Sequence, residues 1–293
     1  MAGFDDRDGF IWFDGKLVPW REANIHILTH AMHYASSVFE GQRAYNGVIF
    51  KLREHSERLH KSAEILGFQI PWSVEEIDAA CYEVMKANGL TEAYLRPLAW
   101  RGSEQMGVSP KGTEPHLAIA AWTWGKYFDP AKAEKGIRLD IAPWRRPAPY
   151  TAPVHSKAAG LYMIASLSKQ HADARGFDDA LMFDWRGQVA EATGANAFFV
   201  RDGVIHTPTP DCFLNGITRQ TVMDLARRRG VEVIERAIWP EELESFQQFF
   251  LTGSAAEVTL VQSAGPWRFE VGDLSRQLAR DYDDLVNGRL ENS

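Results

Sequence analysis

The stretch HSKAAG at residues 155–160 is the most informative part of this sequence, because its lysine, Lys157, directly precedes a segment with helical spacing of apolar residues. Ser156 is a residue type that often begins a helix, and the helix dipole would favour the neutral amine of Lys157. Further along come a carboxylate, Glu191, and the stretch GITR at residues 216–219, which opens a second expected helix. A helix start offers backbone N–H groups to an anion. The sequence thus provides a reactive amine, a carboxylate and an anion site, in that order.

These three groups correspond to what pyridoxal 5'-phosphate (PLP) requires from a protein. A lysine amine binds its aldehyde as a Schiff base, a carboxylate keeps its ring nitrogen protonated, and a helix start binds its phosphate. Each residue taken alone has an ordinary explanation, because most lysines and glutamates are solvated at the surface. The order and spacing of the three groups together predict a PLP site.

The composition is that of a globular protein of about two domains, since 293 residues exceed the roughly 100–200 residues of one domain. A net charge of −7 argues against nucleic acid or an anionic membrane as the partner. The two cysteines, Cys81 and Cys212, exclude a disulfide framework and suit a reducing compartment. No window approaches the ~20 apolar residues that span a bilayer, and the acidic N-terminus lacks the apolar run of a secretory signal. We therefore expect a cytoplasmic protein.

Local patterns predict hairpins mixed with helices. Asp-Gly or Asn-Gly pairs at 14–15, 46–47 and 202–203 adopt positive φ at low cost and favour two-residue turns. Helices are expected at 53–66, after a capping box formed by Ser73 and Glu76, at 158–175 and at 218–229, and strands at 117–122, 137–141, 180–183 and 197–200. This mixture, without regular βαβ alternation, predicts two α+β domains. A polar segment at 126–135 is expected as the linker between a small N-terminal domain, 1–125, and a large C-terminal PLP-binding domain, 136–293.

The motifs resemble those of the class IV aminotransferases over about residues 11–261. The segments that carry the resemblance are HYASSVFEG at 33–41, ERLH at 57–60, YLRP at 94–97, MGV at 106–108, WGKY at 124–127, VAEATGANAF at 189–198 and LTGSAAE at 251–257. Within that family the sequence is most similar to the branched-chain amino-acid aminotransferases. The resemblance implies the α+β, two-domain PLP fold type IV, like that of D-amino-acid aminotransferase, with a hairpin-rich small domain and a larger mixed α/β domain.

The resemblance implies roles for individual residues around the cofactor. Lys157 would carry PLP and move the proton between the substrate α-carbon and the cofactor. Glu191 would pair with the pyridine nitrogen, and Arg58 would bind the phosphate. The remaining cofactor-binding residues that the resemblance implies are Tyr162, Gly216, Ile217, Thr218 and Ser254.

The resemblance also implies a substrate pocket that accepts both an aliphatic chain and an anion. Arg96 would bind the second carboxylate of glutamate, since a guanidinium pairs well with a carboxylate. The substrate-binding residues implied are Tyr34, Phe39, Tyr94, Arg96, Val108, Trp124, Tyr127, Ser254, Ala255 and Ala256, with Tyr162 also beside the aliphatic chain. The sequence departs from the family at Gln42, where isoleucine is usual, and this change can soften the aliphatic preference. Ala192 and Ala195 replace common glycines and are expected to alter only local packing.

The implied function is transfer of an amino group between L-Leu, L-Ile or L-Val and 2-oxoglutarate by a ping-pong mechanism. The partners would be small-molecule amino acids and 2-oxo acids and a second copy of the chain, in a homodimer or an assembly of dimers. The loops of Tyr34 and Val108 would then reach the partner's site. The alternatives are a D-amino-acid or R-selective amine transaminase, a 4-amino-4-deoxychorismate lyase, and a PLP carrier without catalytic activity. No metal site is expected, because His30 and His33 lack a completing carboxylate or cysteine.

Overall fold

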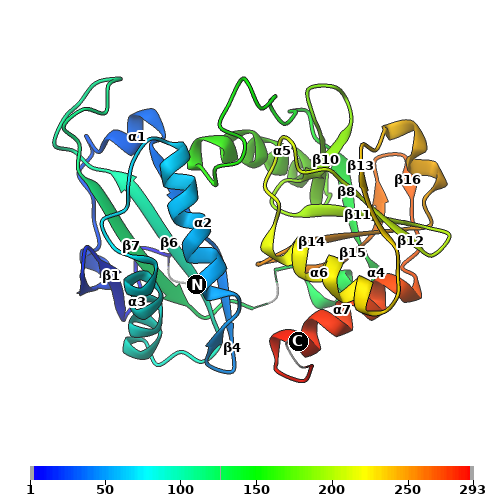
Figure 1. Ribbon diagram of the computed structural model, residues 1–293, viewed down its shortest axis with the longest axis horizontal. Coiled ribbons are helices and arrows are strands. Elements are labelled where there is room, and N and C mark those ends of the chain that lie inside the picture. The colour runs from blue at the N-terminus through cyan, green and yellow to red at the C-terminus, as the bar shows by residue number, and fades with distance from the viewer. Residues whose placement is uncertain (1–2, 126, 291–293) are drawn as a thin grey trace. The chain divides into compact units, whose positions relative to one another are not determined.

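The computed structural model describes residues 3–125 and 127–290 and divides into two compact units (Figure 1). Unit 1 contains the residues up to 125 and the segment 156–161. Unit 2 contains the segment that follows residue 125 and ends at 155, and the residues from 162 onward. Two features were not expected from the sequence. Residues 156–161, with Lys157, belong to unit 1, and the expected linker contains a short helix that packs in unit 2. Lys126, where that linker was expected to begin, lies outside the described residues.

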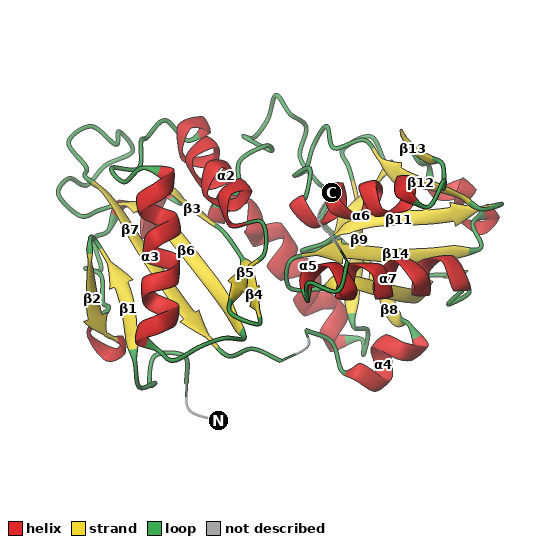
Figure 2. Ribbon diagram, turned by 60° about the horizontal axis from the view of Figure 1, so that its bottom comes forward, coloured by secondary structure: helices red, strands yellow, loops and turns green. Residues whose placement is uncertain are grey.

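Unit 1 is built on a seven-stranded antiparallel sheet. Its strands, in the order in which they lie side by side, are β2 (Lys16–Pro19), β1 (Phe10–Phe13), β7 (Pro115–Trp122), β6 (Ala93–Arg101), β4 (Gln42–Tyr45) and β5 (Val48–Ile49), while β3 (Ser37–Phe39) pairs with another part of β6. Helices α2 (Leu52–Ile65) and α3 (Val74–Ala87) cover one face and form the core with it (Figure 2). The shorter helices are η1 (Trp20–Glu22), α1 (His30–Tyr34) and η2 (Ala159–Leu161).

The hairpins and the capping box form as predicted. Asp14 and Gly15 have φ of 47° and 90°, so both turn residues adopt the left-handed conformation that a two-residue hairpin of matching twist requires. The turns at 46–47 and 202–203 have the same form. At the start of α3, the Ser73 backbone N–H donates to Glu76 (2.7 Å) and the Glu76 N–H donates to the Ser73 hydroxyl (3.3 Å).

The long strand β6 was not predicted, because it contains Pro97, which cannot donate a backbone hydrogen bond. The structure shows why Pro97 is tolerated. β3 pairs with β6 up to Leu98, and β4 pairs with it from Leu95, so Pro97 lies where one neighbouring strand replaces the other. At this break the Glu40 N–H donates to the Pro97 carbonyl (2.8 Å). The break leaves Glu40 and Gly41 between β3 and β4, outside both strands.

Unit 2 is built on a nine-stranded mixed sheet. Its strands, in spatial order, are β10 (Val189–Ala192), β9 (Asp179–Phe183), β8 (Ile137–Ile141), β15 (Glu257–Ala264), β14 (Gln248–Gly253), β11 (Asn196–Arg201), β12 (Val204–Pro208) and β13 (Val233–Arg236), with β16 (Trp267–Arg268) on β15. The helices are α4 (Pro130–Lys135), α5 (Tyr162–Ala174), α6 (Ile217–Arg228), η3 (Pro240–Ser245) and α7 (Asp273–Val286). Helices α6 and α7 pack on each other and on the central strands, and α5 packs on β8 and β9. Among the described residues, no helix is long and apolar enough to cross a membrane.

Candidate functional site

The backbone of Lys157 is fixed between α2 and β3 in unit 1. Its N–H donates to the Ser62 hydroxyl (3.0 Å), and the Ser156 hydroxyl donates to the Ser62 carbonyl (2.9 Å). On the other side the Phe39 N–H donates to the Lys157 carbonyl (3.2 Å). The prediction that Ser156 caps a helix from residue 158 was wrong, since η2 intervenes and α5 begins only at Tyr162. Ser62, fully buried, fixes this segment instead of a helix start.

The amine of Lys157 lies over an aromatic ring. Its Nζ is 5.0 Å from the centroid of Phe39, within the range of a cation–π contact. Phe39 also contacts Arg96, whose guanidinium carbon is 4.7 Å from the same ring. Phe39 therefore lies between the two cationic groups that the sequence assigned to cofactor and substrate.

Arg58 lies on the face of α2 that also carries Ser62, one turn further along. Its Nε and Nη2 donate to the two oxygens of Glu40 at 2.6 and 2.8 Å, and His55 Nδ1 donates to Glu40 at 2.7 Å. Burial alone would raise the pKa of the Glu40 carboxyl, but Arg58 and His55 hold it well below its ordinary value of 4.5. Burial lowers the pKa of His55 below 6.5 although Glu40 opposes the shift, and the charges of Arg58 and Lys157 lower it further. Glu40 is thus an ionised carboxylate in the interior.

Arg96 and Tyr94 lie together on the face of β6 opposite the helices. Arg96 Nη2 donates to the Tyr94 hydroxyl (2.8 Å), and the Tyr94 ring packs edge-on against Trp124 at 4.5 Å. Gly41 permits this arrangement, because a Cβ there would lie 2.2 Å from the Tyr94 hydroxyl. The Nε of Arg96 is buried and has no hydrogen-bond partner among the described residues. The structure therefore brings Phe39, Tyr94, Arg96 and Trp124 together, as the predicted pocket requires.

Gln42 does not belong to that pocket. Its side chain is fully buried on the helix-covered face of the sheet, where the Cys81 thiol donates to its Oε1 (3.6 Å). Neighbouring β4 residues alternate, so Arg43 rather than Gln42 lies on the Arg96 face. Gln42 thus packs in the core and not among the predicted pocket residues, and its effect on the aliphatic preference stays a prediction.

Tyr34 and Val108 lie at the surface of unit 1. Val108 is 81% exposed and Tyr34 is 40% exposed, with its ring against His30 at 4.7 Å. His30 itself bonds to the Ser36 hydroxyl and to the Gly107 carbonyl, which ties α1 to the loop of Val108. The two predicted substrate contacts are therefore neighbours on one surface, and their role stays a prediction.

In unit 2, Glu191 on β10 contacts Arg146 and Asn196. Arg146 Nε lies 3.4 Å from Glu191 Oε1, and Asn196 Nδ2 donates to Oε2 (3.2 Å). Arg146 is buried and also donates to the Cys212 carbonyl (3.3 Å). The carboxylate is thus oriented by a guanidinium and an amide, which stabilise its negative charge. Sequence analysis missed both partners, although Asn196 lies within the quoted motif.

Asn196 links Glu191 to the start of α6. It donates to the Leu214 carbonyl (3.1 Å), and a Cβ on Gly216 would lie 2.2 Å from its Oδ1. Gly216 is the N-cap of α6, confirming the predicted helix start, and within the described part of the chain no side-chain hydrogen bond caps this start. The first turn of α6, with Ile217 and Thr218, is therefore a suitable anion site beside the Glu191 cluster.

The turn between β14 and β15 lies next to the loop that follows Glu191. A Cβ on Gly253 would lie 3.3 Å from the Gly194 carbonyl and 3.5 Å from the Ala195 Cβ, so the two turns are close neighbours. Thr252, opposite Asn196 in the sheet, has a buried hydroxyl without a hydrogen-bond partner among the described residues. Ser254, Ala255 and Ala256 form this turn. The hairpin of Glu191, the start of α6 and this turn thus meet in unit 2.

Tyr162 and Tyr127 are the remaining predicted site residues of unit 2. Tyr162 is the first residue of α5, and Tyr127 is exposed with its ring edge-on to Phe128 at 4.8 Å. Ala192 and Ala195 are both buried in the core of the unit, consistent with the expected effect on packing. The roles of Tyr162 and Tyr127 stay predictions.

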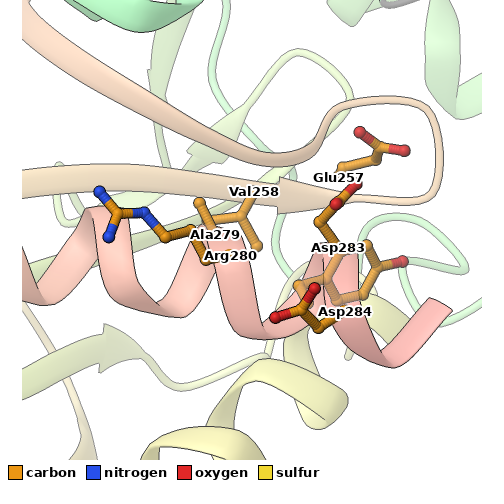
Figure 3. A pocket seen from close by; sticks show the side chains of 7 residues that line it. Glu257, Val258, Ala279, Arg280, Asp283 and Asp284 are labelled. Carbon is orange, nitrogen blue, oxygen red and sulfur yellow. The ribbon is translucent and has the colours of Figure 1, made fainter. Parts of the chain in front are cut away.

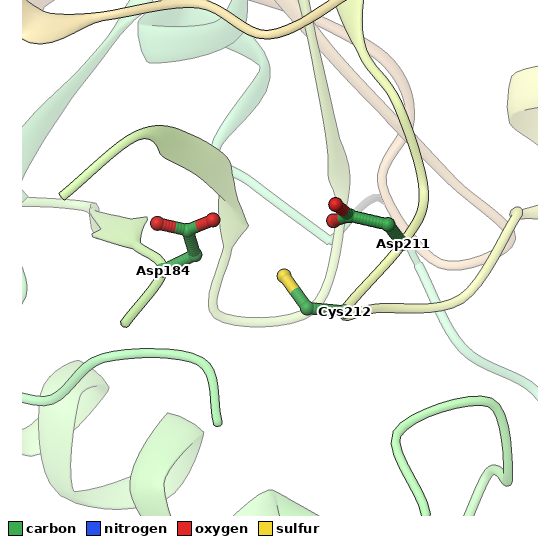
Figure 4. Close-up of side chains that lie close together, drawn as sticks. All are labelled: Asp184, Asp211 and Cys212. Atoms are coloured by element: carbon green, nitrogen blue, oxygen red, sulfur yellow. The ribbon is translucent and has the colours of Figure 1, made fainter. Parts of the chain in front are cut away.

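Unit 2 contains two other features that could form a site, a cluster of possible metal ligands and a pocket. Asp184, Asp211 and Cys212 have ligand atoms within 4.8 Å of one another (Figure 4). Arg186 already pairs with both carboxylates, at 2.6 and 2.7 Å, and burial raises the pKa of the Cys212 thiol. A cation would have to displace Arg186, so we assign no metal role to this group.

The second feature is a pocket of about 460 Å³ between α7 and the end of the β14–β15 turn (Figure 3). It is lined by Glu257, Val258, Ala279, Arg280, Tyr282, Asp283 and Asp284. Both aspartates pair with Arg289, and none of the predicted site residues lines the pocket. It therefore has no part in the site described above.

The sequence matches a known family and named relatives. Residues 37–264 match the family model of the class IV aminotransferases. The chain is 47% identical to a probable branched-chain-amino-acid aminotransferase of Rickettsia felis, over 94% of this chain and 95% of the relative. It is 40% identical to the branched-chain-amino-acid aminotransferase of Pseudomonas aeruginosa, over 98% and 95% of the two chains.

Solved structures of branched-chain amino acid aminotransferases also match this chain. A crystal structure of the Escherichia coli branched-chain amino acid aminotransferase matches with a TM-score of 0.95 and 37% identity, covering 98% of this chain and 97% of that one. The branched-chain amino acid aminotransferase of T.th, complexed with N-(5'-phosphopyridoxyl)-L-glutamate, matches with a TM-score of 0.92 and 38% identity, covering 97% and 96%. These matches confirm the fold that the sequence motifs implied.

Proposed function

The chain belongs to the class IV aminotransferases, and on that basis we propose that it is a branched-chain amino-acid aminotransferase with PLP as its cofactor. It exchanges the amino group between L-leucine, L-isoleucine or L-valine and 2-oxoglutarate. One observation of the structure carries this proposal furthest: Arg96, with a buried Nε that lacks a hydrogen-bond partner among the described residues, lies among the rings of Phe39 and Tyr94. An arginine surrounded by aromatic rings suits a pocket that must accept an aliphatic chain and a carboxylate in turn.

The residues present fit PLP. In unit 1, Lys157 would bind the aldehyde carbon and Arg58 the phosphate. In unit 2, Glu191 would bind the pyridine nitrogen, while the first turn of α6 and Ser254 would bind the phosphate, and Tyr162 would add a hydroxyl contact. The start of α6 supports this assignment, because it has no side-chain cap hydrogen bond among the described residues and because a Cβ on Gly216 would clash with Asn196.

The bound cofactor would supply an electron sink for the substrate α-carbon. The protein's own groups would do the rest. The amine of Lys157 would take the proton from the α-carbon of the amino acid and return it when the oxo acid is converted. The carboxylate of Glu191 would hold a proton on the ring nitrogen, and Arg146 and Asn196 would keep that carboxylate oriented.

We also propose that the protein works as a homodimer or an assembly of dimers in the cytoplasm. Exposed apolar side chains surround Tyr34 in unit 1: Ile27 is 70% exposed, and Met32 and Val108 are largely exposed. Such a patch is the kind of surface that a second copy covers. Both cysteines are free and buried, in keeping with a reducing compartment.

A panel of amino donors tests the proposed reaction. With 2-oxoglutarate as acceptor, L-leucine, L-isoleucine and L-valine should be turned over. Turnover of D-alanine or of an aromatic R-amine instead would indicate the corresponding transaminases, and pyruvate release from aminodeoxychorismate without any acceptor would indicate a lyase. Each of those results would overturn the proposal.

Arg96→Ala tests the pocket itself. It should damage the reaction with glutamate far more than that with leucine, because loss of a buried charge-assisted contact costs about 2–5 kcal/mol. Single-turnover spectroscopy with each donor separates the two halves of the reaction. Arg101→Ala is the matched control: it removes an arginine of the same strand whose side chain instead bonds to Gly67 and Thr113. Equal losses for both donors in the Arg96 variant would contradict the assigned role.

A further inference from the structure

The cluster of Glu40, His55 and Arg58 contains a completely buried carboxylate, Glu40, which accepts hydrogen bonds from both other residues. Burial of an ion pair is weak evidence for stability, since well-packed apolar residues often serve as well. Arg58 is the more exposed member, at 18% of its side chain against 0% for Glu40. Within the pair, Glu40 is thus the more deeply enclosed residue, and the Arg58 side chain keeps some exposure.

The contact pattern fixes the plane of the guanidinium. Arginine has five N–H donors in a rigid fork, and Glu40 engages the edge formed by Nε and Nη2 with two bonds. A two-point contact removes rotation about the long side chain, which a single contact would leave. His55 in turn donates to the same carboxylate through Nδ1, and its position on α2, three residues before Arg58, keeps both donors on one face of the helix.

We propose that Glu40 is a positioning residue for the phosphate-binding arginine: it holds one edge of the Arg58 guanidinium so that the other edge is presented to the phosphate of PLP, with His55 holding Glu40. This inference rests on the proposed function, which assigns the phosphate to Arg58. It gives a role to the glutamate at the break between β3 and β4.

The negative charge of Glu40 acts against phosphate binding, so orientation and charge must be separated in the test. Glu40→Asp keeps the charge but shortens the side chain, so it cannot reach both nitrogens of Arg58 from the same backbone position. Glu40→Gln keeps the length but removes the charge and places an amide N–H₂ against the guanidinium. If orientation dominates, both variants weaken phosphate binding; if charge dominates, Glu40→Gln tightens it and Glu40→Asp leaves it unchanged.

The experiment compares the dissociation constants of PLP and of pyridoxal, which lacks the phosphate, by equilibrium dialysis of the full-length protein after cofactor removal. Glu40→Asp should weaken the binding of PLP about tenfold, the upper end of what immobilising one long side chain contributes, and leave the binding of pyridoxal unchanged. Glu242→Asp is the matched control, because Glu242 makes an equivalent two-point contact with Arg236 in unit 2. It should leave the ratio of the two constants at the wild-type value.

Two further variants make each outcome decisive. Arg58→Ala should bring the dissociation constant of PLP close to that of pyridoxal, so that the ratio of the two constants collapses. The double variant Glu40→Asp/Arg58→Ala should match Arg58→Ala alone, since Glu40 acts only through Arg58. An unchanged ratio in Arg58→Ala would refute the proposed phosphate role itself. A collapsed ratio in Arg58→Ala with a wild-type ratio in Glu40→Asp, or tighter PLP binding in Glu40→Gln, would overturn the positioning role alone. If Glu40→Asp does not fold, the isosteric Glu40→Gln variant decides between the two accounts.

Discussion

A largely buried arginine–carboxylate pair lies at the candidate site in each unit, and the two pairs are used in opposite senses. In unit 1 the arginine is the more exposed partner, with Arg58 at 18% and Glu40 at 0%. In unit 2 it is the carboxylate, with Glu191 at 14% and Arg146 at 8%. In both pairs the more exposed group is the one that the proposed function assigns to the cofactor, and the more buried group supports it.

The two pairs also differ in the distances between their donor and acceptor atoms. Glu40 and Arg58 share two contacts of 2.6 and 2.8 Å, whereas Arg146 approaches Glu191 at 3.4 Å and Asn196 supplies a second donor at 3.2 Å. A two-point contact fixes orientation, while a single longer contact mainly stabilises charge. The comparison suggests that the phosphate-binding group needs a fixed direction and that the ring-binding carboxylate needs a compensating charge.

Glu191→Gln should have the largest effect on rate. A neutral amide cannot hold the ring nitrogen protonated, so turnover should fall about 10²–10³-fold, or about 2.7–4 kcal/mol. The cofactor should stay bound, because Lys157 and the start of α6 are unchanged. Measuring kcat together with PLP content checks both statements, and deuterium at the substrate α-carbon should give a larger isotope effect in the variant. Near wild-type turnover would remove Glu191 from its assigned position.

Arg146→Gln should have a smaller effect in the same direction, since the supporting group acts only through Glu191. We expect a loss of roughly tenfold in kcat, the lower end of what a hydrogen bond to a charged group contributes. Arg145→Gln is the control, because Arg145 is exposed and bonds to the Asp184 carbonyl instead. A loss of kcat as large as that of Glu191→Gln would contradict the view that Arg146 acts only by supporting Glu191.

The smallest expected effect is on stability and comes from His55. Because its pKa is lowered in the folded protein, the unfolded chain binds more protons below pH 6.5, and stability is lost as the pH falls through that value. His55→Asn should remove about 1 kcal/mol of the stability change between pH 7 and pH 5.5, measured by urea unfolding.

His116 provides the opposite control for that measurement. Burial would lower the pKa of His116, but Asp14 and Glu104 raise it above 6.5. Its contribution is therefore fully present below pH 6.5 and is lost as the pH rises through the raised pKa. His116→Asn should remove the stability that wild type gains as the pH falls from the raised pKa to 6.5, so its net loss of stability between pH 7 and pH 5.5 should be larger than that of wild type. A shift in the same direction as that of His55→Asn would contradict these environments.

Elements with a local cause could be predicted from the sequence. The turn at Asp14 and Gly15 and the capping box at Ser73 depend on residues within three positions of each other, and both formed as expected. β6 was missed because Pro97 argues against a strand, and only the change of partner from β3 to β4 makes it tolerable. The tail after residue 261 gave no clear signal, yet it ends in α7.

The same division holds for the candidate site. Lys157, Glu191 and Gly216 could be proposed because motifs surround them. Their supports could not, since Ser62 and Lys157 lie 95 residues apart and contacts between distant segments leave no periodic pattern. For the same reason the error at Ser156 arose from a local rule, helix capping, which a long-range hydrogen bond to Ser62 overrides.

Borohydride reduction of the purified protein, followed by peptide mapping, tests the central assignment most directly. The cofactor should become covalently fixed to the peptide that contains Lys157, because that amine would carry the aldehyde. Lys157→Ala should abolish both the adduct and turnover, while weak PLP binding through the phosphate contacts remains. Lys169, which is paired with Asp173 on α5, offers a control through Lys169→Ala, whose adduct and turnover should match wild type. An adduct on another lysine, or none in protein that binds PLP, would contradict the account.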